Sequence, residues 1–219
     1  MYIPPHFAEP RVEVLHQLIG ARPLATLVTL SSNGLDANHI PLHLSQNPAP
    51  FGTLRGHVAR ANPVWHGIEN DIENDIQALA IFHGPESYIT PSWYPSKAET
   101  GKVVPTWNYA VVHAYGTLRL VDDPAWLRAH LDELTAHNET GFPSPWQLED
   151  APADFIGKMI GAVVGIEMVI TRLLGKWKTS QNQPDGNRAG VVRGLRASGT
   201  SATAEMATLV EALTPRGDQ

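Results

Sequence analysis

Four aromatic rings share one proline-rich segment, residues 92–112, with amine and amide groups. The rings belong to Trp93, Tyr94, Trp107 and Tyr109, and the polar groups to Lys97, Lys102 and Asn108. Pro95 and Pro105 would each interrupt a helical hydrogen-bond ladder, so this segment is not the apolar stripe of a helix. Flat rings beside amines and an amide suit a ligand that is planar at one end and anionic at the other. The alternative is a tryptophan-rich loop that seals a core.

A second polar patch, residues 54–63, has the sequence L-R-G-H-V-A-R-A-N-P. Arg55, His57 and Arg60 supply hydrogen-bond donors, and Gly56 would let a ligand approach the backbone. Asn62 followed by proline is typical of a helix start, where free N–H groups attract anions. The patch therefore suits a phosphate group. The alternative is that both arginines are surface cations without a fixed partner.

A third patch, residues 175–184, has the sequence G-K-W-K-T-S-Q-N-Q-P. Two lysines, a tryptophan and several hydroxyl and amide groups are too polar for a core strand. They suit a strand end that meets a ligand or a partner subunit. The alternative is an exposed loop that Trp177 anchors.

Composition excludes several classes of protein. The 219 residues include no cysteine, which excludes disulfide scaffolds, thiolate metal sites, covalent c-type haem and cysteine catalysis. Common nucleotide-binding and hydrolase motifs are missing. His39 and His43 lie about 13 Å apart if they share a strand, too far for one metal ion, so we expect no metal site.

The first residues resemble no signal peptide, which predicts a cytoplasmic protein without membrane segments.

Charge is unevenly distributed along this acidic chain, whose net charge is −6. Residues 172–196 carry six basic side chains and one acid, and this face could attract an anion or DNA. A solvated surface is the alternative.

The pattern of elements predicts a mainly β, α+β fold with six or seven strands. Strands are expected over residues 24–30, 35–44, 52–58, 77–82, 87–90, 108–121 and 162–170. Helices are expected over residues 9–19, from 62, from 123, around 155–160 and from about 203. The order lacks regular strand–helix alternation, which favours a closed or partly closed antiparallel barrel.

The three patches, taken together and in this order, carry a family resemblance. Matching segments are M-Y-I-P-P-H-F, A-N-H-I-P-L, L-R-G-H-V-A-R-A-N-P, S-W-Y-P-S-K, G-K-V-V-P-T-W-N-Y, A-P-A-D-F-I and G-K-W-K-T-S-Q-N-Q-P. They resemble the PaiB-type family of FMN-binding negative transcriptional regulators, within the FMN-binding split-barrel superfamily. The resemblance covers roughly residues 1–195. We therefore expect a split-barrel domain over residues 1–196 and a C-terminal helical tail over residues 197–219.

This resemblance implies a split β-barrel homodimer with FMN bound in a cleft at the subunit interface. The phosphate and ribityl chain would be held by His39, Ile40, Leu42, Arg55, Gly56, His57, Arg60 and Asn62. The flavin ring would lie near Trp107 and Asn108. Lys178, Gln181 and Asn182 would reach flavin edge atoms or close the interface, and Lys97 completes the expected cofactor-binding residues.

Three functions follow from the resemblance. The first is a flavin or redox sensor that represses genes, as in the control of protease production and sporulation. The sequence has no helix-turn-helix motif, so an indirect regulatory role is as plausible as direct DNA binding. The second is an FMN-dependent oxidoreductase that takes hydride from a nicotinamide cofactor. The third is a haem-handling protein, with His57 or His113 as axial ligand.

Overall fold

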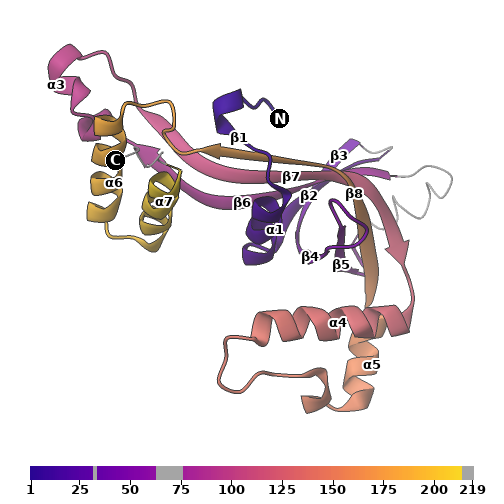
Figure 1. Cartoon of the computed structure of the whole chain (residues 1–219). Helices are drawn as coiled ribbons and strands as arrows, with labels where there is room; N and C mark the ends of the chain where they lie inside the picture. The colour runs from indigo at the N-terminus through magenta and orange to yellow at the C-terminus, as the bar shows by residue number, and fades with distance from the viewer. Residues whose placement is uncertain (32–33, 63–75, 214–219) are drawn as a thin grey trace. The chain divides into compact units, whose positions relative to one another are not determined.

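The structure, a computed structural model, describes residues 1–31, 34–62 and 76–213. In this part of the chain one sheet contains eight strands, drawn as arrows in Figure 1. The strands are β1 (Ala8–Glu9), β2 (Leu24–Ser31), β3 (Gly34–Pro41), β4 (His43–Ser45), β5 (Thr53–Ala59), β6 (Ile76–Ile89), β7 (Thr106–Val121) and β8 (Val163–Lys178). Their order is β3-β2-β6-β7-β8-β5-β4, and β1 pairs with β8. The pairings whose register is defined are antiparallel.

Helices follow or interrupt these strands. They are α1 (Val12–Ala21), α3 (Ser96–Thr100), α4 (Pro124–Glu139), α5 (Ala153–Gly161), α6 (Asp185–Ala197) and α7 (Ser201–Ala212), with 3-10 turns η1 (Pro5–Phe7), η2 (Pro91–Trp93) and η3 (Leu148–Asp150). The expected mainly β, α+β fold with an antiparallel sheet is confirmed. None of the described helices is long and apolar enough to cross a membrane.

Contacts divide the chain into two compact units. Unit 1 comprises residues 1–15, 83–112 and 174–219, and unit 2 comprises residues 16–82 and 113–173. Strands β6, β7 and β8 each contribute residues to both units. The division expected from the sequence, at residue 196, stays a prediction.

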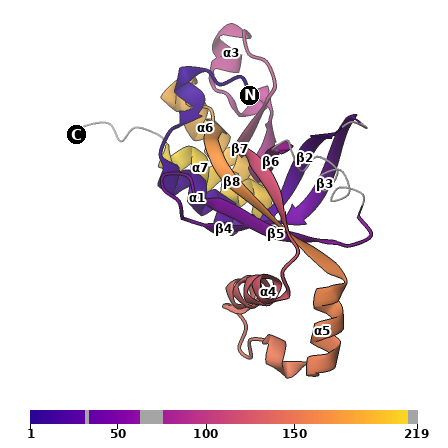
Figure 2. The ribbon, with the colours of Figure 1, turned by 90° about the vertical axis from the view of Figure 1, so that its right-hand side faces the viewer.

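Unit 1 has a core between its two C-terminal helices, which lie side by side in Figures 1 and 2. Val191 and Leu195 of α6 and Met206 and Val210 of α7 are almost completely buried there. The side chain of Thr200 caps α7 by accepting a hydrogen bond from the Thr203 amide. Helix α7 is therefore part of a packed core in this unit.

Unit 2 has its own small core where α4 meets α5 and η3. Leu127, Leu148, Ile156 and Ile160 are buried in it. The start of α4 follows its sequence signal, because the Asp123 carboxylate accepts a hydrogen bond from the Ala125 amide and proline stands at the first helical position.

Several element boundaries differ from the predictions. Strand β6 is continuous across Gly84 and Pro85, where two strands and a turn were expected. Its buried positions run 76, 78, 80 and 82, then 87 and 89, so the alternation changes phase without ending the strand. A proline removes only one N–H, so a strand can continue where that group needs no partner.

Other differences lie near the three polar patches. Strand β8 extends to Lys178, eight residues beyond its predicted end at 170, and α6 was not predicted. The first helix begins at Val12 rather than at residue 9, because Ala8 and Glu9 pair with β8. The helix expected after Asn62 lies outside the described residues.

Candidate functional site

A small pocket in unit 1 lies where the aromatic segment meets the end of β8. Its volume is about 140 Å³. It is lined by Tyr94, Val104, Thr106, Asn108, Lys178, Ser180, Asn182 and Gln183. We call these eight residues the unit 1 pocket. The first and third polar patches of the sequence, about 70 residues apart, therefore form one site.

Lys178 connects the two patches. Its ammonium group donates hydrogen bonds to Thr106 Oγ1 and to the Trp107 carbonyl oxygen, the latter at 2.6 Å. Burial lowers the pKa of Lys178, and the charge of Lys176 lowers it further. A partly desolvated cation at a pocket wall is a strong donor to an anionic or carbonyl oxygen.

Tyr94 lines the same pocket and has a buried hydroxyl group. Only 4% of this residue is exposed, and its hydroxyl is buried without a hydrogen-bond partner in the described structure. Burial raises the pKa of the phenol, so it remains a neutral O–H donor. A buried hydroxyl without a partner is costly, which points to a ligand that would supply one.

A buried amide side chain, that of Asn108, also lines the unit 1 pocket. Asn108 is 1% exposed and donates a hydrogen bond of 2.9 Å to Ser180 Oγ. Ser180 has a φ of 65°, a left-handed conformation that costs free energy in a residue with a side chain. Unusual backbone conformations of this kind cluster at ligand sites.

Of the residues expected here, Asn108, Lys178 and Asn182 line the pocket, whereas Lys97, Trp107 and Gln181 do not. Trp107 is 54% exposed and meets the Tyr88 ring edge-on at 5.9 Å between centroids. Gln181 accepts from the Thr179 amide and donates to the Trp177 carbonyl, so it shapes the turn. Lys97 donates to Ser92 Oγ at 3.1 Å.

The second polar patch lies in unit 2 and already has protein partners. Arg55 Nε donates to the Glu167 carboxylate at 3.1 Å, and Arg60 forms an ion pair with Asp122 at 2.6 Å. Asn62 donates to Asn38 Oδ1 at 3.0 Å. A phosphate at Arg60 would have to compete with Asp122, which the sequence did not reveal.

The remaining residues expected to contact FMN lie around β3 and β5. His39 is exposed, whereas Ile40 and Leu42 are buried. A Cβ atom on Gly56 would lie 2.7 Å from Leu42 Cδ2 and 3.1 Å from the Pro41 carbonyl oxygen. The glycine thus permits close packing of β5 against this segment. The assignment of these unit 2 residues to FMN stays a prediction.

His57 belongs to a buried histidine pair with α4. Its Nδ1 lies 3.3 Å from Nε2 of His130, which is 2% exposed and stacks on Trp126. Burial lowers the pKa of both rings, and the positive charge that His57 would carry helps to lower that of His130 to about 4. Within the described ranges, no three histidine, aspartate or glutamate side chains are grouped as metal ligands.

This pair predicts a loss of stability in mild acid. The unfolded chain binds a proton at its His130 near pH 6.5, whereas the folded chain resists protonation until about pH 4. Unfolding therefore takes up protons between these pH values, and stability falls as the pH decreases. We expect a decrease on the order of 2 kcal/mol in the free energy of unfolding between pH 7 and pH 4.5.

Urea unfolding at several pH values measures this slope. His130→Leu should flatten the dependence, whereas His6→Gln, at an exposed histidine, should leave it unchanged. An equal slope in all three proteins would contradict the assignment to His130.

The basic segment 172–196 is largely engaged in internal contacts. Arg172 lies over the Tyr115 ring at 3.8 Å, Arg188 pairs with Asp185, and Arg196 pairs with Glu211. The two ion pairs leave less positive charge available for DNA than the sequence count suggests.

The site list from the sequence omitted five residues of the unit 1 pocket, Tyr94, Val104, Thr106, Ser180 and Gln183. Val104, Thr106, Ser180 and Gln183 stand in segments quoted for the family resemblance, but nothing in those segments marked them individually as site residues. Tyr94 was part of the S-W-Y-P-S-K segment, and its position between prolines was the available signal.

Comparisons with known proteins show the family to which the chain belongs. The family described as "Putative FMN-binding domain" matches residues 1–172. The chain belongs to this family. An uncharacterized protein of Emericella nidulans is 35% identical over 241 residues, covering 96% of each chain. The Bacillus subtilis protease synthase and sporulation protein PAI 2 is 26% identical over 213 residues, covering 96% of this chain and 97% of its own.

Solved structures share the fold at low sequence identity. A conserved hypothetical protein of Mycobacterium tuberculosis has a TM-score of 0.58 and 11% identity, covering 84% of this chain and 94% of its own. The FAD and heme binding protein from Mycobacterium smegmatis has a TM-score of 0.57 and 16% identity, covering 78% of this chain and 73% of its own. The fold is that of split-barrel flavin-binding proteins.

Proposed function

We propose that this protein binds FMN at the unit 1 pocket and acts as a flavin or redox sensor with a negative regulatory role in transcription. The observation that carries the proposal is a pocket lined by Lys178, Asn108 and Tyr94, whose buried hydroxyl has no hydrogen-bond partner in the described structure. The matched family, whose description names FMN, supports this choice of ligand.

The donor set fits the polar edge of a flavin. An isoalloxazine ring presents carbonyl oxygens and ring nitrogens along one edge, and the phosphate is anionic. Lys178, Tyr94 and Asn108 offer an ammonium, a hydroxyl and an amide to such groups. When bound, FMN would supply electron-transfer or hydride chemistry, and the protein would bind and orient it.

The size of the unit 1 pocket supports a dimeric site. At about 140 Å³ it is smaller than the roughly 300–1,000 Å³ of typical ligand pockets. Val104, which lines the pocket, and Trp107 are exposed and offer apolar surface to another chain. In this proposal two copies associate so that each completes the other's FMN site.

Regulation in this proposal need not involve direct DNA binding. Three arginines of the basic segment are engaged within the chain, and the net charge is −6. A flavin-dependent contact with another protein fits these charges better than a large cationic footprint does. The relationship to the Bacillus subtilis sporulation protein supports a regulatory role.

An FMN-dependent NAD(P)H oxidoreductase is the second candidate. Its chemistry needs open space over the flavin, and the large rings of Trp93, Tyr94 and Trp107 would restrict that space if they lay over the flavin. The Trp93 ring instead lies against Gly194 of α6, and Tyr94 is buried, so only Trp107 is exposed. Haem binding through His57 or His113 has less support, because the His57 ring contacts His130 and the His113 ring contacts the Tyr115 hydroxyl.

One spectroscopic series tests the cofactor and distinguishes these functions. The purified protein, incubated with FMN and gel-filtered, should retain an absorption band at about 450 nm. Bleaching of this band by NADPH without oxygen would favour the oxidoreductase over the sensor. No retained band would refute tight FMN binding, and a Soret band after haem addition would favour the third candidate.

A further inference from the structure

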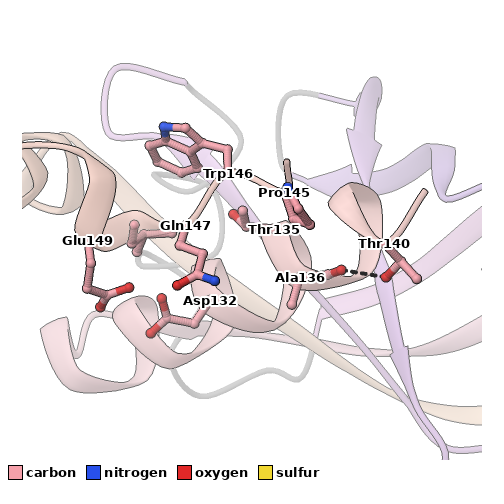
Figure 3. A pocket seen from close by; sticks show the side chains of 9 residues that line it. Asp132, Thr135, Ala136, Thr140, Pro145, Trp146, Gln147 and Glu149 are labelled. Atoms are coloured by element: carbon pink, nitrogen blue, oxygen red, sulfur yellow. Dashed lines mark hydrogen bonds between the residues drawn. The ribbon is translucent and has the colours of Figure 1, made fainter. Parts of the chain in front are cut away.

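A second, larger pocket lies in unit 2, between α4 and the segment that follows it (Figure 3). Its volume is about 450 Å³, within the range of small-molecule sites. It is lined by Asp132, Thr135, Ala136, Thr140, Pro145, Trp146, Gln147, Leu148 and Glu149. We call these nine residues the α4 pocket. None of the residues expected from the sequence to bind FMN lines it.

The chain around this pocket is strongly acidic. Residues 129–157 contain six carboxylates and neither lysine nor arginine. The carboxylates are those of Asp132, Glu133, Glu139, Glu149, Asp150 and Asp154. Two of them, Asp132 and Glu149, line the pocket and extend toward the same side of it in Figure 3.

One arginine neutralises this pair in part. Arg128 Nη2 donates to Glu149 at 2.5 Å, whereas its Nε lies 4.0 Å from Asp132. The Asp132 carboxylate is therefore less completely paired than the Glu149 carboxylate. The two carboxylates and the Arg128 guanidinium together carry a net negative charge. Both carboxylates remain partly exposed, with side-chain exposures of 45% and 64%, so a ligand can reach them.

The rest of the pocket is preformed and combines apolar surface with the polar side chains of Thr135, Thr140 and Gln147. Trp146, 43% exposed, contributes an indole ring, and Pro145 and Ala136 add aliphatic surface. The backbone N–H of Trp146 donates a hydrogen bond to Glu139 Oε2 at 3.0 Å, and the backbone N–H of Gln147 donates one to the Asp150 carboxylate at 2.9 Å. These two bonds fix the loop that carries the indole before any ligand arrives.

We propose that the α4 pocket binds a small organic cation: an amine attached to an apolar body. The ammonium group would lie against Asp132 and Glu149, and the apolar body would lie along Trp146 and Pro145. Carboxylates accept charge-assisted hydrogen bonds from ammonium groups, and the indole and proline rings offer apolar surface to the rest of the ligand. An anion would meet net negative charge, and a bare metal ion would leave the indole and proline surface without a role.

Hexylamine is a suitable probe, with hexanoate and hexanol as its anionic and neutral counterparts. Binding is followed by the indole N–H signal of Trp146 in two-dimensional NMR spectra, which Trp146→Leu identifies among the six tryptophans. Hexylamine should shift this signal in a saturable, salt-sensitive manner, whereas the other two compounds should shift it at least tenfold more weakly.

The double variant Asp132→Asn, Glu149→Gln should weaken hexylamine binding at least tenfold, and Asp154→Asn, an acid of the same region outside the pocket, should not. Equal binding of all three compounds, or unchanged hexylamine affinity in the double variant, would overturn the proposal. The absence of a saturable shift with hexylamine would also overturn the proposal, even if a basic peptide bound to the α4 pocket. FMN binding should be unaffected in every variant. A negative result for the α4 pocket can therefore be distinguished from a negative result for FMN binding at the unit 1 pocket.

Discussion

Replacing Lys178 with methionine is expected to weaken FMN binding by at least tenfold. Among the described residues, the Lys178 ammonium group is the only cation lining the unit 1 pocket, and a hydrogen bond to a charged group contributes about 1.5–3 kcal/mol. Each 1.4 kcal/mol corresponds to a factor of ten in Kd. Methionine keeps similar length and flexibility but removes the charge, and flavin fluorescence measures the affinity.

The matched control is Lys102→Met, at an exposed lysine of the same unit that does not line the pocket. It should leave FMN affinity unchanged. Lys178 also contacts Thr106 and the Trp107 carbonyl, so urea unfolding must show that the variant remains folded. A folded Lys178→Met protein with normal FMN affinity would remove this residue from the site.

The second large effect is expected from Gly190→Ala in α6. A Cβ atom at this position would lie 1.9 Å from the Trp93 carbonyl oxygen and 3.3 Å from Pro95 Cδ. The first distance is far below a van der Waals contact with backbone, so η2 and α6 must move apart. Overpacking of this kind costs about 1–3 kcal/mol, and we expect the upper end of the range because the clash is with backbone.

Gly186→Ala provides the control on the same helix. No atom lies within 4 Å of a Cβ atom there, so alanine should be neutral or stabilise the helix by up to about 1 kcal/mol. The midpoint of urea unfolding distinguishes the two variants. Equal midpoints would show that α6 does not pack closely on Trp93.

Local signals in the sequence predicted much of the fold. The Asp123–Pro124 start of α4 was predictable because a cap depends on neighbouring residues alone. The strand at 108–121 was predictable from its β-rich composition, and it extends from Thr106 to Val121. The continuity of β6 was not predictable, because Gly84 and Pro85 locally favour a turn and only the neighbouring strands override that preference.

Helix α6 shows a different limit. Gly190 and Gly194, four residues apart, lower helix propensity, so the sequence disfavours a helix there. In the structure, both glycines face Trp93, and added Cβ atoms would collide with its backbone or its ring. The glycines are required by packing, which no local pattern reports.

The candidate site was predictable in its parts. The sequence identified the segments that contain Trp107, Asn108 and Lys178, because their residue types are unusual outside a ligand site. It did not show that Lys178 would contact Thr106, since strand pairing brings together residues about 70 positions apart. The burial of His130 could likewise not be predicted from the sequence, because it depends on contact between α4 and β5 rather than on the neighbours of His130 in the sequence.

Titration of the wild-type protein with FMN tests the central claim most directly. Flavin fluorescence and sedimentation should be measured on the same samples. We expect saturable binding of one FMN per chain, with the protein sedimenting as a dimer. If no saturable binding is seen at FMN concentrations up to about 1 mM, FMN binding at the unit 1 pocket is contradicted. A Kd of about 1 mM corresponds to a binding free energy of only about 4 kcal/mol.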